Sequence, residues 1–525
     1  MLTFSLIQRI LVSAVAAITL TAAPQSAPAA GGSITRTVDG KPNLQGIWQA
    51  SSSAGADLQD HAARNNMLGG RSVVVGGEIP YQPQAAAKRA ENYKNRLKAD
   101  PYRQCFLPGT PRIMYLDYPF QVFQTPQAIA MTFEWSLAYR LIPIDGNKHP
   151  EDYDSWMGDS RGHWENDTLV VDVANHNDKT WLDMAGDFHS EALHLVEHYR
   201  MTDPDTILYE ATIEDPKVFT KPWTIQFPLR RRVDRDRLFE YVCQAELEEE
   251  NGLFTREERT WYPGDGSPLP EMAAGGRIAP RATRAPVPNI RRTANGKPDF
   301  NGFYVPDGGG ANYGLEKHGP SPGNLTPTGR GVVVDPPDGI LPMRPWALKE
   351  RVSRNLPERG YDDPTAHCFP PGVPRSMYVP TSFHILQTPE YVVVLHERTA
   401  WRIISLNRSQ HLPDTIRLWQ GDSIGRWEGD TLVVETTNLN GKTWLNESGE
   451  IVSYAERVVE RFTSASRDKI DYEATVTDPA VYTRPWTIAL SFDRDSKFEL
   501  TEGACHEEDH SLPHLKALKD AAAKK

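Results

Sequence analysis

Two eighteen-residue stretches, GDSRGHWENDTLVVDVAN (158–175) and GDSIGRWEGDTLVVETTN (421–438), are nearly the same. Around them, 17 of the 26 positions from Trp156 to Trp181 match those from Trp419 to Trp444 without a gap. Other segments return in the same order, for example DGKPNLQGIW (39–48) as NGKPDFNGFY (295–304). Two copies at so long a period indicate two homologous domains rather than a solenoid of short repeats.

The copies divide the chain of 525 residues into two predicted domains, 31–261 and 289–525. Residues 262–288 are rich in Pro, Gly, Arg and Ala, lack periodicity and are predicted to form a linker. Residues 1–30 place Arg9 before an apolar run and a patch of small residues, the layout of a cleavable signal peptide. We therefore expect a periplasmic or secreted protein with no integral membrane segment after signal cleavage.

The composition narrows the classes of partner and cofactor. A formal net charge of −12 argues against nucleic acid as a partner. The sequence contains no P-loop, GxGxxG or CxxCH motif, so no cofactor is predicted. HEEDH (506–510) fits HExxH literally but follows Cys505 directly after the last predicted strand, so no metal site is predicted. Nothing in the sequence indicates the oligomeric state.

The four cysteines repeat with the domains. Cys105 and Cys243 lie 138 residues apart, and Cys368 and Cys505 lie 137 apart. In an exported protein this spacing predicts one disulfide bond in each half, Cys105 to Cys243 and Cys368 to Cys505. The alternative is four buried free thiols.

After each first cysteine the chain breaks into short runs rich in β-branched and aromatic residues, such as FQVFQT (120–125) and AIAMTF (128–133). Helical patterns are few: one is expected at 83–98, and its counterpart starts at Pro345 and is broken by Pro357. Closure into a barrel or a sandwich removes exposed strand edges. We predict a mainly β fold, a tandem duplication of an antiparallel up-and-down barrel with a short helical insert.

Two resemblances bear on this fold. The opening GIW (46–48) resembles the start of lipocalin-like (calycin) barrels, although the second half has GFY. The series CFLPGTPR (105–112), GDSRGHWENDTLVVD (158–172), EDPKVFTKPWT (214–224) and EYVC (240–243) resembles a large family of secreted, mostly uncharacterised bacterial proteins. This second resemblance implies export and a β-rich fold, and no specific reaction.

The repeated GDS motif has two interpretations. Gly158 and Gly162 permit turn conformations, and ENDT (165–168) is typical of a two-residue hairpin turn, so the motif is interpreted as architecture. Alternatively, Asp159 and Asp422 point into a barrel mouth, where a low dielectric would suit them to acid–base chemistry.

Strand alternation places Leu195, Glu197 and Tyr199 on one face, and Val458, Glu460 and Phe462 on the equivalent face of the second half. A carboxylate on such an apolar face should be buried and paired or protonated. We expect a salt bridge to Arg112 or Arg375, or else a catalytic or ligand-orienting carboxylate.

Histidines distinguish the halves. His189 and His194 of the first half correspond to Val452 and Arg457 of the second. Because histidine beside a carboxylate is suited to proton transfer near neutral pH, chemistry is expected in the first half if anywhere.

Three hypotheses of function follow. The first is binding of a small hydrophobic or aromatic molecule inside each barrel. The second is a cofactor-free isomerase, lyase or hydrolase, and the third is an envelope interaction module without a pocket. The candidate catalytic residues are Asp159, His189, His194 and Glu197. The candidate ligand-binding residues are Arg112, Trp156, Tyr199, Arg375, Trp419, Asp422 and Glu460.

Overall fold

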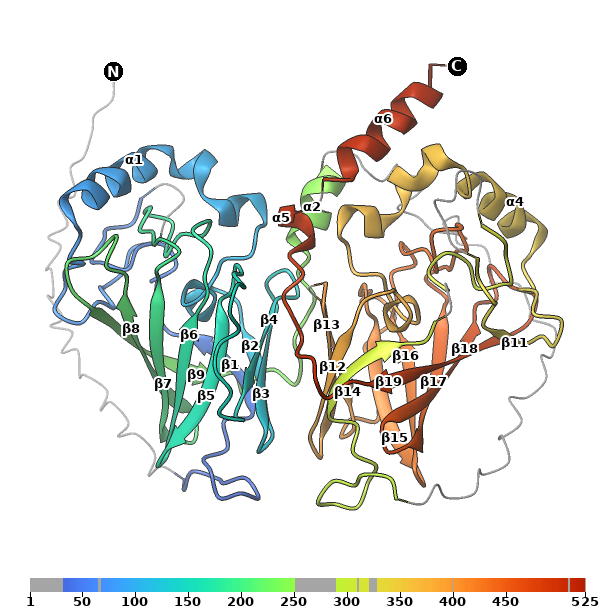
Figure 1. Ribbon diagram of the computed structural model, residues 1–525, viewed down its shortest axis with the longest axis horizontal. Helices are drawn as coiled ribbons and strands as arrows, with labels where there is room; N and C mark the ends of the chain where they lie inside the picture. The colour runs from blue at the N-terminus through green and yellow to red at the C-terminus, as the bar shows by residue number, and fades with distance from the viewer. Residues whose placement is uncertain are drawn as a thin grey trace, which may run out of the picture.

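The protein forms two β-barrels that lie side by side, with helices gathered at one end of each (Figure 1). The computed structural model describes residues 32–64, 68–250, 289–308, 311–320, 328–398, 400–508 and 510–524. The expected signal peptide and linker lie outside these residues. Among the described helices, none is long and apolar enough to cross a membrane.

The first barrel is a nine-stranded antiparallel sheet with the order β4-β3-β2-β1-β9-β8-β7-β6-β5. Its strands are β1 (Gly46–Ala50), β2 (Phe120–Gln124), β3 (Ala128–Phe133), β4 (Tyr139–Pro143), β5 (Asp159–Glu165), β6 (Thr168–Ala174), β7 (His194–Asp203), β8 (Thr206–Glu214) and β9 (Trp223–Arg231).

The second barrel repeats this order and closes its ring. Its strands are β10 (Gly302–Pro306), β11 (Val333–Asp335), β12 (Phe383–Gln387), β13 (Tyr391–His396), β14 (Ala400–Ser405), β15 (Asp422–Glu428), β16 (Thr431–Thr437), β17 (Arg457–Ser466), β18 (Lys469–Thr477) and β19 (Trp486–Arg494). β10 pairs with both β12 and β19, and a short parallel pairing of β14 with β15 completes the ring. The predicted tandem duplication of an antiparallel barrel is confirmed; the parallel pairing of β14 with β15 and the short strand β11, which pairs with β19, are additions.

The helices follow the sequence pattern. α1 (Pro83–Ala99) matches the expected first helix, and α4 (Pro345–Arg354) ends shortly before a 3₁₀ turn that begins at Pro357. Three further helices lie near the junction of the barrels in Figure 1: α2 (Cys243–Glu250), α5 (Cys505–Glu508) and α6 (Leu512–Ala522).

The repeated motif forms the β5–β6 hairpin in the first half and the β15–β16 hairpin in the second. Asn166 and Gly429 in the two turns adopt positive φ angles of 53° and 61°. Gly158 also has a positive φ of 72°, but Gly162 does not, so the turn expected there is wrong. A Cβ atom at Gly162 would lie 2.5 Å from Ile144 Cδ1, which means that this glycine allows the side chains from the end of β4 to pack against β5.

Both predicted disulfide bonds are confirmed. Cys105 bonds to Cys243 and Cys368 to Cys505, with Cα–Cα distances of 5.5 and 5.8 Å.

A buried ion pair lies inside each barrel. Glu197, which is 0% exposed, accepts hydrogen bonds from Arg140 at 2.6 Å and from the Tyr209 hydroxyl at 2.7 Å. In the second barrel Glu460 pairs with Arg402 and accepts a hydrogen bond from Tyr472 at 2.8 Å. Burial and pairing of the two glutamates are as expected, but the expected partners, Arg112 and Arg375, are wrong.

The barrels are joined by two crossing segments, which we name strap 1 (residues 232–243) and strap 2 (residues 495–505). The Glu240 carboxyl group of strap 1 accepts hydrogen bonds from the backbone N–H groups of Trp419 and Gln420 in the second half. Glu502 of strap 2 accepts the equivalent bonds from Trp156 and Met157 in the first half, at 2.7 and 3.0 Å. Each strap therefore caps the loop before the GDS motif of the opposite barrel.

An apolar core fills the seam between the straps. It draws residues from both halves, including Phe123, Ala130, Leu238, Val393, Leu395 and Trp401. The Trp401 indole also donates a hydrogen bond to the Phe133 carbonyl at 2.9 Å, and the Tyr139 hydroxyl donates one to the His396 carbonyl at 2.9 Å. The outward faces of β2, β3, β12 and β13 are thus buried against the other barrel.

Removing one member of a buried ion pair should lower the free energy of unfolding far more than removing both members. Glu197→Leu leaves Arg140 charged and unpaired, and should lower the free energy of unfolding by about 3–5 kcal/mol. The double variant Arg140→Met/Glu197→Leu should recover most of this loss. Urea unfolding followed by near-UV circular dichroism measures both, with Glu460→Leu and Arg402→Met/Glu460→Leu as the matched set in the second barrel. Equal losses in single and double variants would contradict this explanation.

Candidate ligand site between the two barrels

The four candidate catalytic residues belong to three separate hydrogen-bond networks. Glu197 lies in the barrel core, where the charge of Glu197 raises the pKa of Arg140 even though burial alone would lower it. The buried Tyr199 hydroxyl belongs to the same network and contacts Arg140 at 3.1 Å. Glu460 has the equivalent place in the second barrel.

His189 is 2% exposed and lies below the surface of the first half. Its Nε2 is 2.6 Å from the Thr180 hydroxyl, and its Nδ1 is 2.9 Å from the Ser190 carbonyl. Burial lowers the pKa of His189, so its ring is neutral near pH 7. These contacts hold the two ends of the loop from Thr180 to Ser190 close to each other inside the protein.

Asp159 and His194 are linked by two residues that sequence reasoning missed. Asp159 Oδ2 is 2.5 Å from His149 Nδ1, and His149 Nε2 is 2.8 Å from Asp172 Oδ1. The same Asp172 oxygen is 3.0 Å from His194 Nε2. The second half has a looser equivalent, in which His411 lies 3.1 Å from Asp422 and 3.9 Å from Glu435.

The candidate ligand-binding arginines are structural. Arg112 forms a two-bond salt bridge to Asp100, with both distances 2.8 Å, and Arg375 forms the same bridge to Asp363, with both distances 2.9 Å. All four side chains are at most 5% exposed. Each bridge fixes the short 3₁₀ turn that precedes a disulfide cysteine.

Trp156 and Trp419 lie at the seam. Their rings pack on Phe106 and Phe369, and their backbone N–H groups are the ones capped by the straps. Asp422 lies beside them and lines a cavity between strap 1 and the second barrel.

This seam cavity is the best candidate for a ligand site. Strap 1 supplies one wall, with Arg237, Leu238 and Glu240, and the second barrel supplies the opposite wall. The cavity volume is about 40 Å³, and the figure rises to about 520 Å³ only when adjoining space open to solvent is counted. The cavity is also lined by Gln121, Asp236, Tyr391, Trp401, Arg402, Ile403, Arg408, Gln420 and Asp422.

Two glutamine side chains in the cavity wall have unpaired polar atoms. Gln420 is 2% exposed, and neither its Oε1 nor its Nε2 has a hydrogen-bond partner in the protein. Gln121, which is 3% exposed, has an unpaired Oε1. Other buried side chains, such as Glu456 and Trp156, also have unpaired polar atoms, but among the described residues Gln121 and Gln420 are the ones that line this cavity.

The equivalent place on the other side of the seam is built differently. The aligned residue is Met157 where the cavity has Gln420, His384 where it has Gln121, and Gly146 where it has Arg408. The two halves therefore share the strap contact, but only the side with Gln420 presents this set of polar groups.

The charged groups of the cavity are paired with one another. Arg237 binds Asp236 at 2.8 Å, and Arg408 binds Asp422 at 2.7 Å. Burial alone would raise the pKa of Asp422, but hydrogen bonds from His411 and Arg408 hold it below the usual range. Burial raises the pKa of Glu240 to about 8, so this carboxyl group is largely protonated at pH 7.

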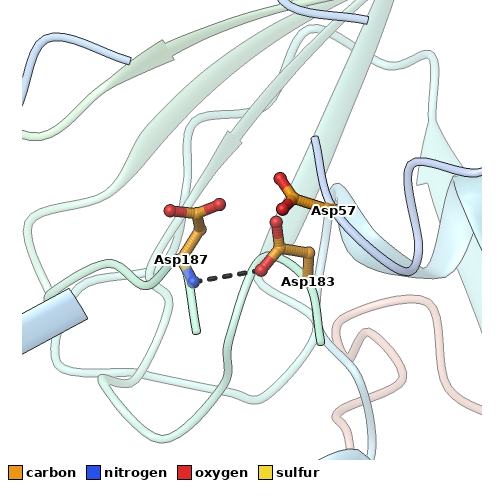
Figure 2. Close-up of side chains that lie close together, drawn as sticks. All are labelled: Asp57, Asp183 and Asp187. Carbon is orange, nitrogen blue, oxygen red and sulfur yellow. Dashed lines mark hydrogen bonds between the residues drawn. The ribbon is translucent and has the colours of Figure 1, made fainter. Parts of the chain in front are cut away.

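A second cluster, Asp57, Asp183 and Asp187, is the one group of carboxylates in the described residues that could hold a metal ion (Figure 2). All three are buried, and their nearest ligand atoms lie within 4.8 Å of one another. Arg89 binds Asp187 at 3.0 Å and lies 3.9 Å from Asp57. Burial, followed by the charge of Asp187, raises the pKa of Asp183 well above its usual range.

The second half provides an internal control for this cluster. Asn446 stands at the position of Asp183, while Arg351 pairs with Glu450 at 2.8 Å and Glu316 at 3.1 Å. Asn446 Oδ1 accepts the Ser448 N–H at 3.0 Å, just as Asp183 Oδ1 accepts the Ala185 N–H at 2.9 Å. A neutral side chain thus serves this position, which supports a protonated Asp183 rather than a metal ligand.

Sequence signals for the seam site did exist. Glu240 and Glu502 each lie three residues before the second cysteine of their half, a repeat that the motif comparison passes over. Gln420 stands where the first half has Met157, next to the repeated GDS stretch, and this difference between the copies is a second signal. His149 and His411 do not align without a one-residue shift.

Comparison with known proteins adds little. No family model and no curated protein matches this chain. One solved structure with some similarity is a protein of unknown function from the DUF3598 family of Nostoc punctiforme PCC 73102. It is 7% identical, the match covers 74% of this chain and 92% of that one, and the TM-score is 0.14, too low to support any argument.

Asp183→Asn should stabilise the protein at neutral and alkaline pH. The pKa of Asp183 is higher in the folded protein than in the unfolded chain, so its stabilisation is complete below about pH 4 and is lost as the pH rises. Asparagine does not titrate, so the variant's gain in melting temperature should grow from pH 4 to pH 8, by about 2–4 °C for each kcal/mol.

Differential scanning calorimetry at several pH values measures this gain, and Asn446→Asp is the matched control, with the opposite sign. A melting temperature that falls on adding EDTA in the wild type but not in Asp183→Asn would contradict the protonated-carboxyl explanation and indicate a bound divalent cation.

Proposed function

We propose that this two-barrel protein binds a small molecule in the seam cavity. The observation that carries the proposal is Gln420, a buried residue in the cavity wall whose side-chain Oε1 and Nε2 both lack a hydrogen-bond partner in the protein. We also propose that the protein is exported with residues 1–30 as its signal peptide, because disulfide bonds persist in oxidising compartments. The family of secreted bacterial proteins remains the proposed relationship.

The barrel interiors favour the seam over the aromatic pocket first expected in each barrel. The inward-facing Arg140, Glu197 and Tyr209 of the first barrel contact one another and are at most 3% exposed. The second barrel has the same contacts. A ligand there would have to displace a buried ion pair, whereas a ligand at the seam would not have to break any hydrogen bond between the Gln420 side chain and the protein.

The free energy needed to bury the unpaired Gln420 side chain also supports a ligand site at the seam. A buried donor or acceptor without a partner costs about 1–3 kcal/mol. Met157 at the equivalent position avoids this cost, so the fold does not require a glutamine. Ligand sites commonly lie between domains and combine apolar walls with a few convergent polar groups, as this cavity does.

Gln420→Met should therefore raise the melting temperature of the unliganded protein while abolishing ligand binding. A thermal-shift screen of a fragment library on the intact chain identifies binders. The hits should lose at least tenfold in affinity in Gln420→Met and in Arg408→Gly, which copies Gly146. Met157→Gln on the opposite side of the seam is the matched control and should bind as the wild type does. A screen without hits would refute the seam site, and so would hits whose affinity is the same in the wild type and in both variants.

A second candidate function is acid–base chemistry at the Asp159–His149–Asp172–His194 chain. The observation in its favour is that two imidazoles meet one Asp172 oxygen, at 2.8 and 3.0 Å, with His194 40% exposed. Partly exposed histidines held by carboxylates are suited to general acid–base work.

If this row of four hydrogen-bonded side chains is catalytic, the rate of hydrolysis of a probe such as p-nitrophenyl acetate should fall by about 10²-fold or more in His149→Gln and His194→Gln. His163→Gln, at an exposed histidine paired with Glu165, is the control and should change nothing. Equal rates in all four proteins would remove this candidate.

A further inference from the structure

We infer that the seam cavity takes a neutral molecule with a flat apolar body and an edge that carries one hydrogen-bond donor beside one acceptor, as in a primary amide or a lactam. This inference rests on the proposed function and adds the chemical class of the ligand.

The donor–acceptor edge follows from Gln420. A carboxamide offers one acceptor and one donor side by side, and both are free here. An amide ligand satisfies the two at once through a pair of complementary bonds. A carboxylate supplies only acceptors and an amidinium only donors, so either would leave one Gln420 atom buried and unpaired. The inference holds for either orientation of the Gln420 carboxamide, because neither Oε1 nor Nε2 has a partner in the protein.

The neutral charge follows from the pairing within the walls. Arg237 is bound to Asp236, and Arg408 to Asp422. Arg402, which also lines the cavity, is bound to Glu460 in the barrel core. The carboxyl of Glu240 already accepts two backbone N–H groups. No charge of either sign is left over among these groups, so an ionic ligand would lose hydration without gaining a counter-charge.

The flat apolar body follows from the remaining lining. Leu238 of strap 1 faces a second-barrel wall that includes Tyr391, Trp401 and Ile403. The Trp401 indole is fixed by its hydrogen bond to the Phe133 carbonyl, and Tyr391 packs edge-on against Phe123 at a ring distance of 5.3 Å. Fixed aromatic and aliphatic side chains of this kind provide a preformed apolar surface.

Three probes of the same shape test the class: benzamide, benzoate and benzamidine. Isothermal titration calorimetry of the intact chain at pH 7 should give benzamide an affinity at least tenfold higher than the other two. Gln420→Glu, which replaces the donor by an acceptor, should reverse the order in favour of benzamidine by at least tenfold. Gln420→Met, with folding checked by near-UV circular dichroism, should lose benzamide binding, and Met157→Gln should retain it.

The outcomes separate this inference from the proposed function. Equal or tighter binding of benzoate or benzamidine to the wild type, lost in Gln420→Met, would overturn the ligand class and leave the seam site standing. The class is also overturned if none of the three binds while other fragments do so in a Gln420-dependent way. If nothing binds in either experiment, both proposals fail.

Discussion

Two glutamates make the same contact in opposite directions, and the arrangement of the molecule depends on it. Glu240 caps two backbone N–H groups of the second half, and Glu502 caps the equivalent pair of the first. Each strap ends at a cysteine bonded to its own barrel, so the crossing segment is fixed at both ends. Because the capped loops lead directly into the GDS strands, the position of those strands depends on the neighbouring barrel as well as their own. The repeated motif is thus the point where two otherwise complete barrels become one structure.

The buried ion pairs complement this contact from inside. An Arg–Glu pair in a low-dielectric core adds little net stability compared with well-packed apolar residues, because desolvation offsets the attraction. It does restrict geometry: the Arg140 guanidinium on β4 must meet Glu197 on β7 and Ser160 on β5 at once. We interpret the pair as fixing how β4 meets β5, the two strands at the ends of the first sheet order, where no antiparallel ladder sets their register. Gly162, which leaves room for side chains from the end of β4, serves the same junction.

The sequence predicted what local patterns and internal repetition determine. Alternation placed Glu197 and Glu460 on buried faces, the turn residues located the hairpins, and cysteine spacing gave both disulfide bonds. It failed where partners come from distant segments. Arg140 lies 57 residues from Glu197, and no periodicity distinguishes it from Arg112. Trp156, Trp419 and Asp422 were predicted as ligand-binding residues and do lie at the seam, but the contact between the halves was not predicted, because comparing the halves as equivalents does not show what one half does to the other. Strands such as β3 and β13 are apolar on both faces, and this pattern indicates that something covers their outward face, which in the structure is the other barrel.

The two sides of the seam differ at one buried position, where one side has Gln420 and the other has Met157. A pseudo-symmetric junction offers two equivalent places, and the straps use both alike. The fold is satisfied by Met157 on one side, so a glutamine with two unmet polar atoms on the other lowers stability without any structural return. Asn446 and Asp183 differ in a comparable way, but there the side-chain oxygen on each side accepts a backbone N–H. The Gln420 carboxamide has no hydrogen-bond partner in the protein, so this residue supports a function more strongly than the histidines or the acidic cluster do.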